Sequence, residues 1–465
     1  MNSIVPFPSI AQTERPLPWL VLMLLTIAFF IALHDPMRSY SIGEDYLPTE
    51  DTLEKHASEG NAKRQIGFLM VGGIGTLILL STNRRPLIMN GGLAMLIAFF
   101  MCWISLSILW ADQPALTGRR LIVIATLAVG ALAVVTRLSL RELVLFVFFS
   151  SLAYLLIGIA SELALGTFRP TLDRYRFSGT IHPNNQGVNC SLILLSGITA
   201  ALTEKKYKLF FAAMVGLALA FLLLTKSRTS LISFLVALSL FVVVTFGHSR
   251  HFAFAMSLLM TAVFSVLLLA SDTVSSYLSN AILLGRTDQD VSGAMTLTGR
   301  LPLWQHLLEY AAERPIQGYG YGSFFTVDRI RDISAHQDWP IAECHSVFLE
   351  VLLGLGIVGV TSYAMIQILG FVRTITYARA TGDTRYAFLG SLLLLGIVGG
   401  LAESTLLVPT MQTFVQFVTL AFVAFQMPSG EALQHSRAAN QNRFSAPPIR
   451  SLRQAGAHAN GRHPL

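Results

Sequence analysis

Long uninterrupted apolar runs recur along most of this chain, and they constrain its fold more than any other feature. Each run approaches about 20 residues, which as a helix is long enough to cross about 30 Å of hydrocarbon. A helix satisfies its backbone polar groups within one segment, and the alternating pattern of a membrane β-barrel is absent from the sequence. Only 13% of the residues are charged, against about 25% in an ordinary soluble domain. The sequence therefore predicts an all-α, polytopic helical bundle in a membrane.

The apolar runs also predict how the chain is divided. Residues 1–16 are expected to form a cytoplasmic N-terminus, residues 17–427 a transmembrane domain, and residues 428–465 a polar, disordered cytoplasmic tail. A large outer loop, 271–345, separates the ninth and tenth spans, and the first run lacks a cleavage site and is expected to be retained. About twelve spans are expected, at residues 17–33, 66–82, 87–110, 121–136, 143–165, 185–203, 209–224, 230–247, 253–271, 346–371, 386–408 and 410–427.

Lysine and arginine in the short connections predict the orientation. Short cytoplasmic connections carry an excess of basic residues. Every second connection along this chain has that excess, so these connections are expected to face the cytoplasm. The basic pI of about 9.4 is therefore explained by topology rather than by nucleic-acid binding. The residues that identify the cytoplasmic side are Arg84, Arg85, Arg137, Arg141, Lys205, Lys206, Lys208, Arg250, Arg373, Arg379 and Arg385.

Two short connections on the outward side are unexpectedly basic. The turn TKSRTS contains Lys226 and Arg228, and the stretch before the sixth span contains Arg176, His182 and Asn184. Arginine presents a planar fork of donors that binds phosphate oxygens bidentately, and a lipid-linked diphosphate lies at the depth of these connections. The alternative is that these side chains anchor to lipid headgroups or pair with acids of the outer loops. Further outward basic residues are Arg119, Arg120, Arg169, Arg174 and Arg300.

His345 lies where the large outer loop meets the tenth span. It could simply cap that helix, as Asn184 could cap the sixth span. Guanidinium groups nearby disfavour the charged form of an imidazole, so a neutral His345 could also accept a proton as a general base. Three acids lie within apolar runs and are expected to face the bundle interior near its outer half, paired with arginine or held protonated, in a structural or a catalytic role: Glu162, Glu350 and Glu403.

The large outer loop has an amphipathic helical pattern of its own. In GRLPLWQHLLEYAAERP the apolar positions share one face, Pro315 ends the helix, and GYGYG follows as a tight turn. Asp288 and Asp290 form a D-x-D pair, a spacing common by chance, and no C-x-x-C is present, so neither a metal nor another cofactor is expected. The shared face consists of Leu303, Leu307, Tyr310 and Ala311.

Five short motifs in order resemble the O-antigen ligase and Wzy-type polysaccharide polymerase superfamily of bacterial inner membranes. They are R-x-S-G-T-x-H-P-N from Arg176, S-R-T-S from Ser227, G-R-L-x-L-W from Gly299, P-I-x-G-Y-G-Y-G from Pro315, and H-S-x-x-x-E-x-x-x-x-x-G-x-x-G from His345. The resemblance covers residues 100 to 430. One departure is Ser346, where the family often has asparagine, so a side-chain amide contact at that position is not expected.

The resemblance implies a metal-independent glycosyltransferase of the bacterial inner membrane whose active site faces the periplasm. The donor would be a glycan on undecaprenyl diphosphate, with Arg228 and Arg300 holding the diphosphate and His345 activating the acceptor hydroxyl. The remaining candidates for substrate binding are Arg120, Arg176, His182, Asn184, Lys226, Trp304, Tyr319 and Glu350.

Three functions remain open from the sequence. The chain most resembles exopolysaccharide polymerases, which join lipid-linked repeat units. An O-antigen ligase, which transfers glycan to lipid A core, would use the same donor. A transporter or flippase of lipid-linked sugar fits the span number, but transporters tend to carry internal repeats and polar groups near mid-membrane. The expected partners are the lipid-linked oligosaccharide, the growing polysaccharide, membrane lipids, a chain-length regulator and export proteins, with no nucleic acid.

Overall fold

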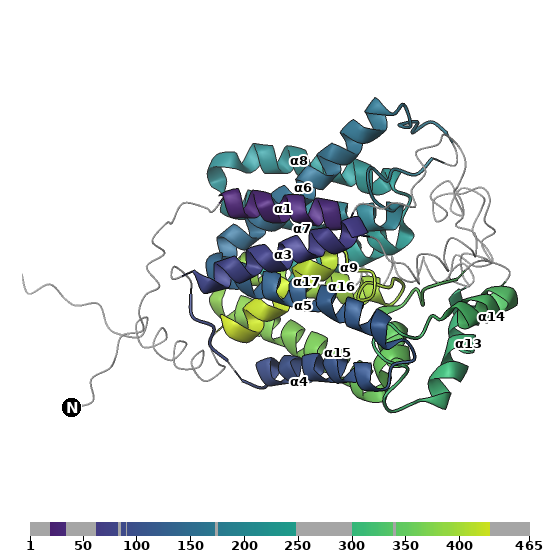
Figure 1. Cartoon of the computed structure of the whole chain (residues 1–465). Coiled ribbons are helices and arrows are strands. Elements are labelled where there is room, and N and C mark those ends of the chain that lie inside the picture. The colour runs from purple at the N-terminus through teal and green to yellow at the C-terminus, as the bar shows by residue number, and fades with distance from the viewer. Residues whose placement is uncertain are drawn as a thin grey trace, which may run out of the picture. The chain divides into compact units, whose positions relative to one another are not determined.

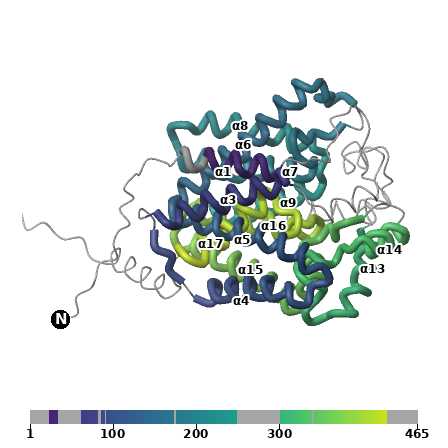
Figure 2. Tube along the Cα trace, viewed as in Figure 1, coloured from purple at the N-terminus to yellow at the C-terminus, as the bar shows by residue number. Residues whose placement is uncertain are grey.

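A computed structural model describes residues 19–33, 62–81, 85–89, 91–172, 175–247, 300–337 and 341–427. The described residues form helices and connecting loops (Figures 1 and 2). The helices are α1 (Trp19–Leu33), α3 (Ala62–Leu80), α4 (Gly92–Leu106), η1 (Ser107–Leu109), α5 (Pro114–Arg137), α6 (Leu140–Ala164), α7 (Pro183–Thr203), η2 (Lys205–Tyr207), α8 (Lys208–Leu224), α9 (Arg228–Phe246), α13 (Arg300–Glu313), α14 (Val327–Gln337), α15 (Val347–Thr381), α16 (Thr384–Gly400) and α17 (Met411–Phe425).

The prediction of an all-α membrane protein is confirmed. Eight described helices are long and apolar enough to span a membrane, and α1, α16 and α17 are shorter apolar helices. Every expected span within the described residues coincides with one of these helices. The expected ninth span, the N-terminus, the D-x-D pair and the tail lie outside the described residues, so the total of twelve stays a prediction.

Local sequence explains where several helices begin and end. Ser139 and Glu142 form a capping box at the start of α6, and Thr410 and Thr413 form one at the start of α17. The helix α15 ends at Thr381 and is capped by Gly382, whose φ of 69° lies in the left-handed region that favours glycine.

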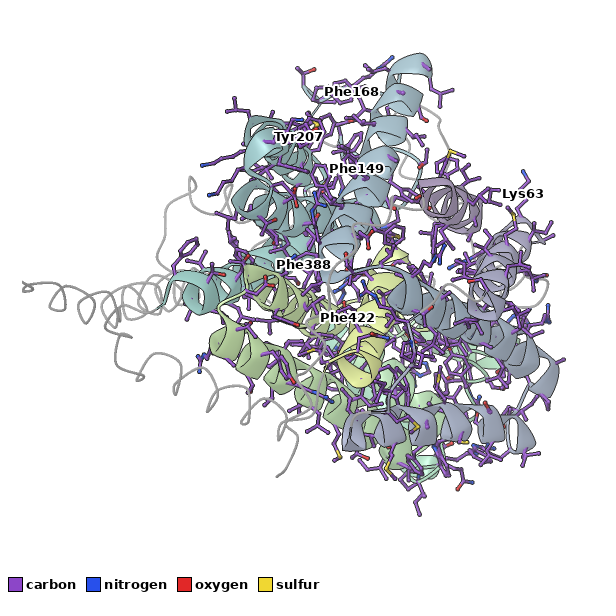
Figure 3. All side chains as sticks on the ribbon, turned by 90° about the vertical axis from the view of Figure 1, so that its left-hand side faces the viewer. Lys63, Phe149, Phe168, Tyr207, Phe388 and Phe422 are labelled. Atoms are coloured by element: carbon purple, nitrogen blue, oxygen red, sulfur yellow. The ribbon has the colours of Figure 1, made fainter. Side chains whose placement is uncertain are left out.

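The bundle has an inner and an outer set of helices. The helix α7 packs against α6, α8 and α9, while α17 packs against α5, α15 and α16. Phe388 of α16 is fully buried, whereas Tyr207 beside α8 is 54% exposed (Figure 3). Outer helices such as α4 and α8 present exposed leucines and methionines, as expected for surfaces that face lipid.

The connecting loops meet at two opposite ends of the helices. At one end Arg141 pairs with Glu204 at 2.5 Å, and Arg373 donates to the Met427 carbonyl, so residues expected on the cytoplasmic side lie together. At the other end, which we call the site end, the loops before α7, α9, α15 and α17 meet. The helices α13 and α14 lie at the site end (Figure 1).

The expected loop helix and glycine turn are present, and the turn has a role that the sequence did not indicate. Within α15, Gly356 has a φ of 67° and a ψ of −167°, which breaks the helix. The loop 315–322 satisfies the broken backbone, because Tyr319 donates to the Leu353 carbonyl at 2.8 Å and Ile357 donates to the Pro315 carbonyl at 2.8 Å. The long outer loop is thereby joined to the first third of α15.

Candidate functional site

Glu162 shapes the segment that leads into α7. Its carboxylate accepts hydrogen bonds from the backbone N–H groups of Ser178 and Gly179 at 3.0 and 2.8 Å, and from the Tyr175 hydroxyl at 2.5 Å. Gly179 lies against Gly158 of α6, where a Cβ would come within 2.6 Å of the Gly158 Cα. These hydrogen bonds of Glu162 hold the segment in place.

A chain of polar contacts crosses the site end from α7 to α13. The Arg176 guanidinium donates to Asn184 Oδ1 at 2.7 Å, and Asn184 Nδ2 donates to Glu403 Oε1 at 3.0 Å. The same Glu403 oxygen pairs with Arg300 Nη2 at 3.3 Å, and Arg300 also donates to the Ala402 carbonyl. Glu403 lies in the loop after α16, so the network joins three segments that are far apart in sequence.

The turn between α8 and α9 packs on this network. Arg176 Nε donates to the Thr225 carbonyl at 3.0 Å, and the Ser230 hydroxyl donates to the Asn184 carbonyl at 3.0 Å. Ser227 caps α9, which places Arg228 at the first residue of the helix, beside the network. Lys226 adopts a left-handed φ of 49°.

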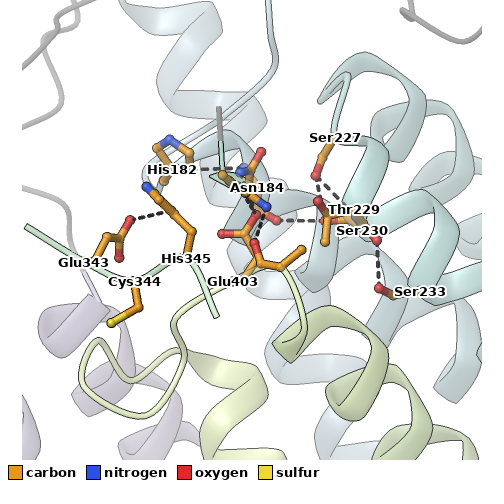
Figure 4. Close-up of polar contacts among 12 residues, drawn as sticks. His182, Asn184, Ser227, Thr229, Ser230, Ser233, Glu343, Cys344, His345 and Glu403 are labelled. Carbon is orange, nitrogen blue, oxygen red and sulfur yellow. Dashed lines mark hydrogen bonds and ion pairs between the residues drawn. The ribbon is translucent and has the colours of Figure 1, made fainter. Parts of the chain in front are cut away.

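His345 stands at the edge of the network (Figure 4). Its Nδ1 lies 3.2 Å from Glu343 Oε1, and the indole of Trp304 donates to the neighbouring Cys344 carbonyl at 2.9 Å. Desolvation by burial, together with the positive charge of Arg300, lowers the pKa of His345 to about 4. The imidazole is therefore neutral near pH 7, as the sequence analysis expected.

Backbone strain coincides with the candidate residues. Among the described residues other than glycine, only Lys226 and His345 have a positive φ, at 49° and 50°. A left-handed conformation costs an L-residue about 1–2 kcal/mol, and such strain clusters at functional sites. Both residues are among the candidates that the sequence indicated.

Three helices begin beside one another at this site. His182 Nδ1 accepts from the Asn184 N–H at 3.3 Å and so caps α7, while Arg228 opens α9 and Val347 opens α15. The N-terminus of a helix carries a partial positive charge and free N–H donors, which suit an anion. The helix termini and arginines together can hold an anionic group next to a neutral imidazole.

Three other candidates, Arg120, Glu350 and Tyr319, make their hydrogen bonds outside this network. Arg120 donates to the Gly322 carbonyl at 2.5 Å, and Glu350 accepts from the Leu407 N–H at 2.6 Å, so both hold loops of the site end. Tyr319 is buried in the core of the outer loop, where its hydroxyl donates to Glu313 at 2.6 Å. The structure thus joins Arg176, His182, Asn184, Arg300 and His345, with Lys226 and Arg228 in the adjoining turn.

Glu403 and Glu343 were not among the predicted site residues. Glu403 was assigned to the bundle interior because the apolar run was read as helical to residue 408, but α16 ends at Gly400. Burial raises the pKa of Glu403, while Arg300 opposes the rise. Glu343 lies two residues before His345, and that spacing was the only sequence signal for it.

Comparisons with known proteins identify sequences that this chain resembles. The family model described as O-antigen ligase matches residues 213–364. The exopolysaccharide production protein ExoQ of Rhizobium meliloti (strain 1021) is 25% identical over 323 residues, which cover 66% of this chain and 71% of that protein. Both matches confirm the predicted resemblance to the O-antigen ligase and Wzy-type polymerase superfamily. The range matched by the family model, 213–364, includes Arg228, Arg300 and His345.

Proposed function

We propose that this chain is a membrane glycosyltransferase that joins undecaprenyl-diphosphate-linked oligosaccharide repeat units into an exopolysaccharide on the periplasmic face. The observation that carries the proposal is the neutral His345 beside Arg300, at a site where three helices begin. The match to an exopolysaccharide production protein supports an exopolysaccharide as the product, while the family model is described as O-antigen ligase, so ligation is kept as the second candidate. The basic residues at the opposite end favour a periplasmic site.

In the proposed reaction an acceptor sugar hydroxyl attacks the anomeric carbon of the donor glycan. The hydroxyl proton passes to His345, the new glycosidic bond forms, and the bond between the anomeric carbon and the carrier diphosphate breaks. General-base assistance of this kind is worth about 10²–10⁴ in rate. A leaving diphosphate gathers negative charge, which positioned donors stabilise best because they need no reorganisation.

Arg300 suits the leaving-group role because two contacts already fix its orientation. Its guanidinium donates to the Ala402 carbonyl and pairs with Glu403, and the side chain is 16% exposed. A guanidinium has five N–H donors, so donors remain for phosphate oxygens. Arg228 would supply the second guanidinium from the first turn of α9.

The test uses purified protein in liposomes with a radiolabelled lipid-linked repeat unit. Wild-type protein should lengthen the glycan. His345→Ala should insert normally but lose elongation by about 10²–10⁴, and Arg228→Lys should restore little activity because lysine cannot bind phosphate bidentately. Ser239→Ala, on the lipid-embedded part of α9, is the matched control and should elongate normally.

The same assay separates the alternatives. Transfer to lipid A core without elongation would indicate a ligase. Movement of the lipid-linked sugar across the bilayer without either transfer would indicate a transporter and refute the enzyme proposal. Unchanged elongation by His345→Ala would exclude the proton-accepting role.

A further inference from the structure

A second cluster of ionisable side chains lies on the outer loop, apart from the network described above. His306 of α13 and Asp332 and His336 of α14 each present one ligand atom, and these atoms all lie within 4.8 Å of one another. His306 Nε2 is 3.8 Å from Asp332 Oδ2, and His336 Nδ1 is 3.6 Å from Asp332 Oδ1. We propose that these three residues bind a divalent transition-metal ion of the zinc class that bridges α13 and α14.

The spacing suits a small ion. Zinc binds imidazole nitrogen and carboxylate oxygen at about 2.0–2.2 Å, so ligand atoms around a tetrahedral centre lie about 3.4 Å apart. The pair formed by His306 Nε2 and Asp332 Oδ2, at 3.8 Å, needs only a small side-chain rotation to reach that separation. Asp332 and His336 are one helical turn apart and therefore share a face of α14.

Neighbouring groups orient the ligands. The Tyr310 hydroxyl donates to Asp332 Oδ2 at 2.6 Å, which fixes one carboxylate oxygen. His336 Nδ1 lies 2.7 Å from the Asp332 carbonyl, and when that nitrogen carries the proton the other ring nitrogen is available to a metal. Hydrogen-bonded supports of this kind are usual around metal ligands.

The packing beneath the cluster makes its backbone rigid. Leu303, Leu307, Ile330 and Ile333 are fully buried between α13 and α14. The ligands themselves face outward, since the side chains of Asp332 and His336 are 45% and 61% exposed. An ion can therefore reach the cluster from solvent without a change of fold.

The ligand set selects the metal. Two imidazoles with one carboxylate suit zinc, copper or nickel, whereas calcium and magnesium prefer six or more oxygen ligands. Three protein ligands leave a position for water. The ion is not assigned to glycosyl transfer. It would brace α13, which carries both Arg300 and Trp304, against α14.

The experiment uses the full-length, untagged, metal-stripped protein in detergent, with Co²⁺ as the spectroscopic probe and Zn²⁺ as the competitor. We expect one equivalent of Co²⁺ to give visible absorption that Zn²⁺ abolishes and that millimolar Mg²⁺ or Ca²⁺ leaves unchanged. His306→Ala and His336→Ala should weaken binding at least about 100-fold, and Tyr310→Phe about 10-fold or more. Gln337→Ala, beside His336, is the matched control and should bind as wild type does.

Absence of a one-equivalent signal would overturn the proposal, as would equal Co²⁺ affinity in wild type, His306→Ala and His336→Ala. Equal weakening by Gln337→Ala would show that the ion binds non-specifically, which also overturns it. The readout is metal binding, so these outcomes are independent of whether the proposed glycosyl transfer occurs. Size-exclusion chromatography confirms that each variant is folded.

Discussion

Replacement of His345 by glycine should separate the effect of backbone strain on stability from the effect of losing the imidazole on activity. His345 has a φ of 50°, a conformation that glycine adopts freely and other residues adopt at a cost. His345→Ala keeps that strain, whereas His345→Gly removes it. Both variants lose the imidazole, so their chemical defects should be the same.

The expected magnitudes follow from these two effects. The left-handed penalty is about 1–2 kcal/mol, and the extra chain entropy of unfolded glycine offsets about 0.5–1 kcal/mol of it. The free energy of unfolding of His345→Gly should therefore be about 0.5–1 kcal/mol higher than that of His345→Ala. Both should elongate glycan about 10²–10⁴ times more slowly than wild type.

The assay compares thermal unfolding in detergent with elongation in liposomes. Gly382→Ala is a useful reference, because Gly382 also has a left-handed φ, of 69°, but lies at the opposite end of α15 with open space around it. Gly382→Ala should lower the free energy of unfolding by about the same 0.5–1 kcal/mol that separates the two His345 variants, and it should elongate glycan as wild type does. The reasoning would be refuted if His345→Gly were less stable than His345→Ala, or if either variant retained wild-type elongation.

Three further predictions follow from the same contacts. Because the pKa of His345 is lowered to about 4, the folded state binds fewer protons than the unfolded state between pH 4 and the usual pKa near 6.5, and the free energy of unfolding should therefore fall as pH falls through this window. The rate of elongation should fall only well below pH 6.5. A pH-rate profile measures this, and a fall in rate centred near pH 6.5 would contradict it. Gly356→Ala should destabilise the protein by about 2 kcal/mol or more, since its Cβ would meet the Ile316 carbonyl oxygen at 2.0 Å, while Gly354→Ala, whose nearest neighbour is at 3.4 Å, should have a smaller effect in the same unfolding assay; equal effects would contradict the role of the break. Asn184→Ala leaves Glu403 with Arg300 alone and should reduce elongation about 10-fold, whereas Asn189→Ala, whose amide donates to the Ser151 carbonyl inside the bundle, should affect stability more than turnover.

The membrane helices were predictable because their signal is local. A run of apolar residues near the thickness of a bilayer has few alternatives, and each expected span among the described residues is a helix. The break at Gly356 was not predictable, since the surrounding sequence is as apolar as an unbroken span. Its backbone groups are satisfied by tertiary hydrogen bonds between the outer loop and α15, from the Tyr319 N–H to the Leu353 carbonyl and from the Ile357 N–H to the Pro315 carbonyl.

The site was partly predictable for a related reason. Arg176 and Arg228 lie in short outward connections where basic residues are normally depleted, and His345 lies at the start of an apolar span, so the residue pattern indicated them. The role of Arg300 was implied by the family resemblance. Glu403 pairs with an arginine, as expected, but it lies in a loop and not in a span, because residues 401–408 continue the apolar character of α16 after its helix has ended. Its contacts with Asn184 and Arg300 join segments more than 100 residues apart, and no local pattern reports such a contact.

The most direct measurement is an electron cryomicroscopy structure of the protein in nanodiscs with undecaprenyl diphosphate bound. Our account predicts density for the two phosphates between Arg228 and Arg300, within a sugar's length of His345, on the periplasmic side. Phosphate density at the opposite end, beside Arg141 and Arg373, or a bound lipid that leaves Arg300 and Arg228 on separate surfaces, would contradict it.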